Sequence, residues 1–118
     1  MLNFTDRDAV MRELANDIVS ISERLKADQL KDGYSIFLKG KKVISIFKKY
    51  DRIVFTMKID SGETINQPHG LKCRTGSCYK IVEIEDKGNV TEGFYVENED
   101  DYNHALNFVA ILFENSPV

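Results

Sequence analysis

Apolar residues near the start of the chain recur at intervals of three and four, which is the spacing of one face of an amphipathic helix. The positions are Val10, Leu14, Ile18, Ile21 and Leu25. Thr5 is the expected N-cap, and Asp8 follows three residues later, where an acidic side chain interacts favourably with the helix dipole. The pattern predicts a helix over residues 6–27.

The apolar period then shortens to two, which is typical of strands with one buried face. This alternation predicts strands over residues 34–38, 43–47 and 53–59. The polar stretches 39–42 and 48–51 between them are short enough to be turns. We therefore expect three antiparallel strands in a meander.

Turn-forming residues fill the stretch 60–77, which is long for a connection without secondary structure. We expect this stretch either to serve a function or to contain a short strand near residues 63–65. A second hairpin is expected from strands at 78–85 and 90–96, joined by the turn 86–89. The second half of the chain thus adds another antiparallel pair to the sheet.

A second helix is expected near the end of the sequence, with Asn98 as its N-cap. Glu99, Asp100 and Asp101 then occupy its first turn, where the helix dipole favours negative charge. The expected buried face consists of Tyr102, Ala105, Leu106, Val109, Leu112 and Phe113.

Together these elements predict an α+β fold in the order α-β-β-β-loop-β-β-α. We expect an antiparallel sheet of about five strands with the N- and C-terminal helices packed on one face. Residues 1–118 would form this single domain. The second face of the sheet would be free of helices, which leaves a homodimer open.

The composition suits a compact domain with a core of its own, since the chain has 118 residues and is 42% hydrophobic. The 16 basic and 19 acidic residues nearly balance, which excludes a histone-like polycation and an acidic disordered tail. No stretch approaches the roughly 20 apolar residues of a membrane span, and the acidic segment 1–8 is unlike a signal peptide. We expect a cytoplasmic protein that does not enter the membrane.

Four residues have the chemistry of zinc ligands, namely His69, Cys73, Cys78 and His104. Their spacing matches no recognised zinc motif, and His104 falls in the expected second helix. In a cytoplasmic chain two such cysteines are more often plain reduced thiols. We expect neither a metal nor a cofactor, and whether Cys73 and Cys78 are redox-active stays open.

Catalytic motifs are incomplete. The pair Gly76-Ser77 lacks the second glycine of a nucleophile elbow. The triplet Glu85-Asp86-Lys87, with Asp60 upstream, has the residue types of a metal-dependent nuclease, but it falls on an expected solvent-exposed turn. Glycine-rich phosphate loops do not occur. These observations favour a non-catalytic protein.

Charge is distributed unevenly, with ten basic and three acidic residues between positions 24 and 58. In the expected meander a basic group lies at each end of the sheet, about 17 Å apart for five-residue strands. One group is Lys39, Lys41, Lys42 and Lys58. The other is Lys31, Lys48, Lys49 and Arg52, with Tyr50 beside them to stack on a base.

The second group, with Tyr50, is the candidate nucleic-acid-binding site, because lysine and arginine neutralise phosphates. The alternative, which the absence of a base-reading motif favours, is that turn lysines merely keep sheet edges and loops soluble. If the protein is a small binding module, nucleic acid is its marginally preferred partner.

An acidic segment supports a rival interpretation. Residues 83–101 contain eight acids against Lys87 alone. The candidate protein-binding residues are Glu83, Glu85, Glu92, Asp100 and Asp101. Such a face would receive a basic partner protein, as an inhibitor, an immunity protein or a secretion-type chaperone does. The size and the pI of about 5.4 are similar to those of type III secretion chaperones.

Two parts of the sequence are similar to a known family. One is the strand pair at 42–47 and 52–59, and the other is the block 93–106, which contains a glycine, an acidic turn and a helix with an alanine. They resemble a family of small bacterial domains of unknown function labelled "predicted transport protein", often found beside restriction-type modules. The resemblance covers residues 34–114, but the Gly-x-Gly-Asp segment expected before the last strand is missing. It implies a non-catalytic bacterial or phage accessory module near nucleic acid and supplies no catalytic residues.

Overall fold

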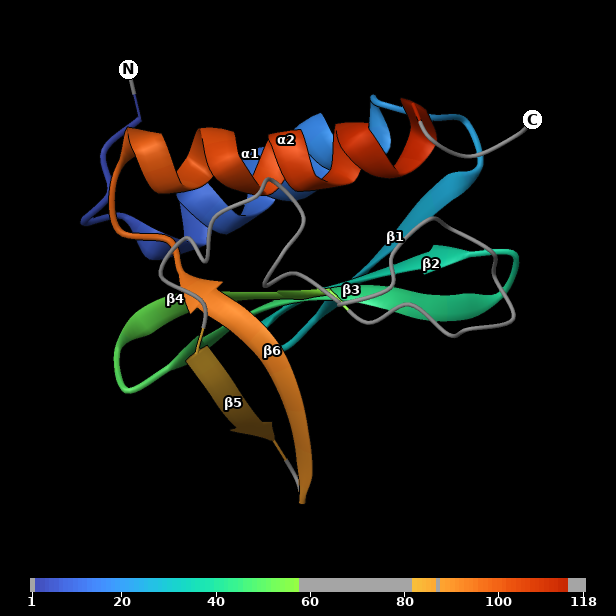
Figure 1. Ribbon diagram of the computed structural model, residues 1–118. Helices are drawn as coiled ribbons and strands as arrows, with labels where there is room; N and C mark the ends of the chain where they lie inside the picture. Colours follow the sequence, from blue (N-terminus) through green and yellow to red (C-terminus); the bar gives the residue numbers. More distant parts are fainter. Residues whose placement is uncertain (1, 58–81, 87, 115–118) are drawn as a thin grey trace.

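The computed structural model describes residues 2–57, 82–86 and 88–114, leaving out the side chains of residues 86, 89–92 and 111–114. Two helices and an antiparallel sheet form an α+β fold (Figure 1). The elements are α1 (Arg7–Val19), β1 (Leu25–Leu30), β2 (Gly33–Leu38), β3 (Lys41–Lys49), β4 (Arg52–Met57), β5 (Val82–Asp86), β6 (Asn89–Tyr95) and α2 (Glu99–Glu114). The predicted fold class is confirmed, with a six-stranded sheet that has one strand more than the sequence pattern indicates.

The strands lie in the order β1-β2-β3-β4-β6-β5, and every neighbouring pair is antiparallel. β2, β3 and β4 form the predicted meander, with two-residue turns at Lys39–Gly40 and Tyr50–Asp51. The second hairpin joins this meander through β6, so β5 lies at the edge. Both helices lie on one face of the sheet (Figure 1), and α1 contacts α2 as well as β1 to β4. This arrangement of the helices is also as predicted.

The first helix is shorter than its apolar stripe suggests. α1 ends at Val19, and Leu25 is buried in β1 opposite Leu38. The prediction of a helix over residues 6–27 is therefore wrong beyond Val19. Residues 26–30 are all exposed and show no alternation, so pairing with β2, rather than their own composition, makes them a strand.

The N-cap of α1 also differs from the expectation. Asp6, not Thr5, is the cap, because the Asp6 carboxylate accepts a hydrogen bond from the Ala9 N–H at 3.2 Å. The Thr5 hydroxyl donates instead to Asn3 Oδ1 at 2.6 Å. The carboxylate is the better acceptor for an unpaired helical N–H, so the helix begins one residue later than a threonine cap implies.

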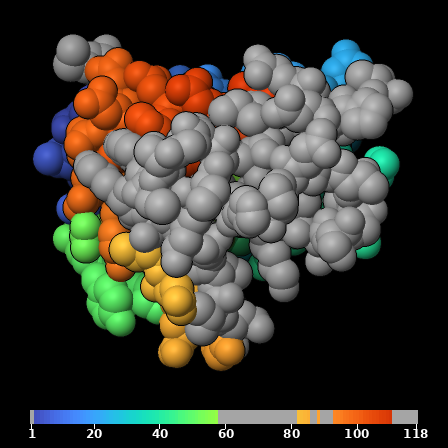
Figure 2. Space-filling model, in the orientation of Figure 1, coloured from blue at the N-terminus to red at the C-terminus, as the bar shows by residue number. Residues whose placement is uncertain are grey.

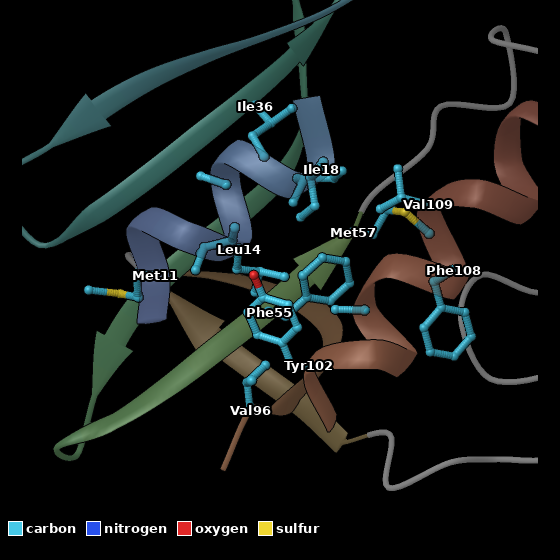
Figure 3. Close-up of a cluster of buried hydrophobic side chains, with 14 of the residues drawn as sticks. Met11, Leu14, Ile18, Ile36, Phe55, Met57, Val96, Tyr102, Phe108 and Val109 are labelled. Atoms are coloured by element: carbon cyan, nitrogen blue, oxygen red, sulfur yellow. The ribbon is translucent and has the colours of Figure 1, made fainter. Parts of the chain in front are cut away.

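The core lies between the helices and the sheet (Figure 3). Leu14 and Ile18 of α1 and Phe55 of β4 belong to one buried cluster. α2 adds Phe108, which is fully buried although it is absent from the predicted face. The other predicted apolar positions whose side chains are described, namely Tyr102, Ala105, Leu106 and Val109, belong to this cluster or pack against it. Leu112 and Phe113 are outside the described side chains.

The start of α2 follows the sequence prediction. The Asn98 side-chain oxygen accepts a hydrogen bond from the Asp101 N–H at 2.9 Å, so Asn98 is the N-cap. One turn later, the Tyr102 hydroxyl donates a hydrogen bond to the carboxylate of Asp17 on α1. This contact joins the two helices at the edge of the core.

The buried position of Tyr102 gives a testable dependence on pH. Burial, reinforced by the Asp17 hydrogen bond, raises the pKa of Tyr102 above its ordinary value of 10.0. Above about pH 10 the unfolded chain loses this proton while the folded chain keeps it, so stability falls as pH rises. We expect Tyr102→Phe to flatten this alkaline loss in thermal melts between about pH 8 and pH 11.

Tyr50→Phe is the matched control, because the Tyr50 side chain is exposed and its substitution should leave the slope unchanged. At neutral pH the Tyr102→Phe protein should be less stable by about 1 kcal/mol, the usual net worth of one hydrogen bond. Equal slopes in the wild type and Tyr102→Phe would contradict this account of the Tyr102 proton.

Candidate functional site

The structure brings the candidate basic residues to one end of the sheet. Lys31 lies in the β1–β2 turn, and Lys48 and Lys49 end β3. The Lys48 N–H donates to the Asp32 carbonyl at 3.2 Å, which joins this turn to the end of β3. Figure 2 shows the β3–β4 end projecting at the left of the molecule beside β5. The gathering of the second basic group at one end is therefore as the meander predicts.

Two ion pairs connect this end of the sheet to the first turn of α1. The ammonium group of Lys48 lies 3.1 Å from Asp8 Oδ1. The guanidinium group of Arg7 lies 3.7 Å from Asp51 Oδ2 in the β3–β4 turn. Both pairs are partly exposed, so each contributes little to stability, but the Lys48 charge already has a carboxylate partner.

Lys49 and Arg52 point toward the second hairpin. The Lys49 ammonium group donates to the carbonyl of Glu85 on β5. Arg52 makes two contacts of 3.0 Å with the Glu97 carboxylate, and its guanidinium carbon lies 3.6 Å from the centroid of the Tyr95 ring. The hydrogen bond with Glu97 raises the pKa of Arg52 above its ordinary value. Both cations therefore connect the meander to the β5–β6–α2 part of the chain.

Tyr50 is highly exposed, with 77% of its surface accessible. Tyr50 and Asp51 both have positive φ, 53° and 58°, a turn conformation that ordinarily takes asparagine and glycine. The Lys49 ammonium group lies 5.4 Å from the centroid of the Tyr50 ring. The Tyr50 ring is thus exposed to solvent. Of the four cations in the same group, Lys48, Lys49 and Arg52 already have partners within the chain.

A hollow of about 420 Å³ lies on the sheet beside this end. Its lining consists of Leu30, Lys31, Asp32, Gly33, Tyr34, Ser35, Lys42, Ser45, Phe47 and Lys48. Cross-strand register places Ser35 opposite Ser45 and Gly33 opposite Phe47. Because side chains alternate along a strand, these residues face away from Ile36, Ile44 and Ile46, which pack beneath the helices. The hollow therefore lies on the helix-free face.

Small residues create the hollow. Gly33 has no side chain and the two serines have short ones, while Leu30 and Phe47 flank Gly33 on the neighbouring strands. Leu30 is 52% exposed, which leaves apolar surface at the rim. Lys31 was a predicted site residue, whereas Ser35, Ser45 and Phe47 were missed. The available signal was their alternation with the buried isoleucines, which places all three on the opposite face.

The candidate acidic residues are not all on one surface. Glu83 and Glu85 on β5 and Asp100 in the first turn of α2 are exposed. Asp101 is fully buried, and its carboxylate accepts the Glu97 N–H at 2.9 Å. Asp101 therefore stabilises the approach to α2 and is not available to a partner. For Glu92 only the backbone is described, opposite Glu83.

The candidate zinc ligands His69, Cys73 and Cys78 are outside the described residues. Among the residues that are described, no cluster of three or more His, Cys, Asp and Glu side chains is placed to hold a metal ion. His104 lies on α2, with Nδ1 3.1 Å from the carbonyl oxygen of Asp100. In the same part of the chain, neither helix has the length and apolarity to cross a membrane.

Comparison with known proteins adds no relative: no family model, curated protein or solved structure matches this chain.

Proposed function

We propose that this protein is a non-catalytic module that binds single-stranded nucleic acid in the hollow on the helix-free face. The observation that carries the proposal is the position of the hollow between the two basic ends of the sheet. Lys31 and Lys48 line it at one end, and Lys42 lines it toward the other. Phe47 and the serine pair lie between them.

The chemistry of the lining fits a single strand. Proteins that bind single strands combine cations along the phosphate backbone with aromatic rings on which bases stack. Lys31, Lys42 and Asp32 give the lining a small excess of positive charge, whereas Lys48 has the strand parity of Ile44 and Ile46 and directs its ammonium group to Asp8 in the helix layer. Ser45 is half-buried, so its hydroxyl group can donate to or accept from a base edge, whereas Ser35 is only 4% exposed and forms the floor of the hollow. A volume of about 420 Å³ is in the range that holds a small ligand, and thus about one nucleotide.

The proposed binding surface does not include Lys49 and Arg52, although both were candidate site residues in the sequence. Both side chains interact with the β5–β6–α2 region, and binding a phosphate would require them to leave the Glu85 carbonyl and the Glu97 carboxylate. Lys31 remains in the site, and Lys42 joins it from the other basic group. Tyr50 stays within the proposed surface as an exposed ring at its end.

The test is fluorescence anisotropy with a labelled single-stranded oligonucleotide of about 12 nucleotides, titrated at several salt concentrations. Lys42→Glu is expected to weaken binding several-fold and to lower the slope of log affinity against log salt by about 0.7 for the lost phosphate contact. Arg12→Glu is the matched control, because Arg12 is an exposed cation on α1, in the helix layer. Equal losses in the two variants would contradict the proposed surface.

Phe47 tests the stacking part of the same proposal. Removing a stacked ring costs about 1–3 kcal/mol per base, so Phe47→Leu should weaken binding by about tenfold or more. Phe47→Tyr keeps the ring and should bind as the wild type does. If Phe47→Leu binds equally well while Lys42→Glu does not, the face attracts phosphates without stacking a base.

A basic protein partner is the second candidate, because the acidic side chains of Glu83, Glu85 and Asp100 are exposed. An interface with a hydrophobic centre responds to salt far less than phosphate contacts do. Failure of the oligonucleotide to bind, together with a nuclease-resistant partner that Glu83→Lys and Glu85→Lys release in a pull-down, would favour this candidate.

A further inference from the structure

The edge strand β1 has an unpaired side. Within the described part of the chain it pairs only with β2, and it is the first strand in the sheet order. Only Leu25 of this strand is buried, and residues 26–30 are exposed. Figure 1 shows β1 at one margin of the sheet. A six-residue edge of this kind presents main-chain N–H and C=O groups to another strand.

We propose that two copies of this chain pair through β1, antiparallel, about a two-fold axis between their Ala27 residues. In this register the numbers of two residues that lie opposite each other add up to 54, so Lys26 lies opposite Asp28 of the second copy. The two-fold axis repeats this pair, which gives two cross-strand ion pairs from one sequence. The strand LKADQL is therefore complementary to itself in charge.

The neighbouring registers are unfavourable. Centring the axis on residue 26 places Lys26 opposite Lys26 of the second copy, and centring it on residue 28 places Asp28 opposite itself. Like charges directly opposite each other destabilise a strand pair. Charge thus selects one register among the three central ones.

This pairing places equivalent faces of the two sheets on the same side, because a two-fold axis perpendicular to a sheet preserves its faces. The helices of both copies would cover one face of the joined sheet. The two hollows would lie on the other face, next to the interface, since the hollow is lined by Leu30, the last residue of β1, and by Lys31, which follows it. The pairing itself does not depend on what the hollow binds.

The test is the molar mass of the full chain in solution by analytical ultracentrifugation, from micromolar to millimolar concentration. The wild type should approach twice 13.5 kDa with rising concentration. Lys26→Glu and Asp28→Lys each place like charges opposite each other in both pairs, so each should raise the dimer dissociation constant by about tenfold. The double variant Lys26→Glu with Asp28→Lys restores opposite charges and should restore the dimer.

Both residues are exposed, so the swaps leave the core intact, and circular dichroism of each variant checks the fold. A wild type that stays monomeric up to millimolar concentration would overturn the proposal. A dimer that both single variants leave unchanged, or that the double variant fails to restore, would overturn the β1 register. No nucleic acid is present in this experiment, so its failure is distinct from a failure of the proposed function.

Discussion

Phe94→Ala is expected to lower the free energy of unfolding by about 3–5 kcal/mol, the usual cost of removing a buried aromatic side chain. Phe94 is fully buried, and its ring centroid lies 5.3 Å from that of Phe55 and 5.9 Å from that of Phe108. It therefore connects β6 both to the meander and to α2. Since single domains are stable by about 5–15 kcal/mol, this change should consume a large part of the stability.

The position of Phe94 places the expected loss at the contact between β6 and the meander. Within the described residues β6 pairs with β4 through three residue pairs, of which Phe94 opposite Phe55 is the central one. Urea unfolding followed by circular dichroism measures the change, and Phe94→Leu should recover more than half of it. Tyr50→Ala, on an exposed ring, is the control and should change stability by less than about 0.5 kcal/mol. A loss for Phe94→Ala below about 1 kcal/mol would mean that α2 is anchored independently of this ring.

Gly33→Ala is expected to destabilise the protein by about 3 kcal/mol, because a β-carbon has no space there. That atom would lie 2.0 Å from the Ile46 carbonyl oxygen and 2.7 Å from the Phe47 α-carbon. Both are backbone atoms, so β2 and β3 must separate to admit it. The change should also distort the floor of the hollow, and oligonucleotide binding should weaken in the variant that remains folded.

Gly40 provides a matched contrast in the β2–β3 turn. A β-carbon at Gly40 meets no atom within 4 Å, but the residue has a φ of +80°. Gly40→Ala should therefore cost only about 1 kcal/mol, from backbone conformation, and Gly40→Asn should recover part of it, since asparagine tolerates this region. Gly33→Ser should be as harmful as Gly33→Ala. Similar behaviour of the two glycines in urea melts would show that the close approach of β2 and β3 is not the cause.

Local patterns in the sequence determined most of the elements. The alternation around Ile53, Phe55 and Met57 predicted the meander, because apolar residues at every second position indicate a strand. The expectation of one buried face is wrong for β4, since Val54 and Thr56 on the other face are buried as well. Asn98 predicted the start of α2, since its side chain satisfies a backbone N–H only three residues away. Signals of this kind act over a few residues and are readable without the fold.

β1 and the buried Asp101 show where local patterns are insufficient. Residues 26–30 are exposed, so no hydrophobic period distinguishes this edge strand from the polar end of a helix. Asp101 has the sequence context of a surface acid in a first helical turn, yet the chain entering α2 buries it against the Glu97 N–H. In both cases the deciding contact is made by the folded backbone.

The candidate site depended most on tertiary structure. The sequence by itself determined that basic residues gather at the two ends of the meander, because turns follow directly from strand spacing. Only the fold decided which charges are already paired, since the partners of Lys48, Lys49 and Arg52 come from α1, β5 and the segment before α2. The hollow likewise forms where Gly33, Ser35 and Ser45 of two strands meet in register. Pairing and register are long-range properties, and a linear pattern of residue types does not contain them.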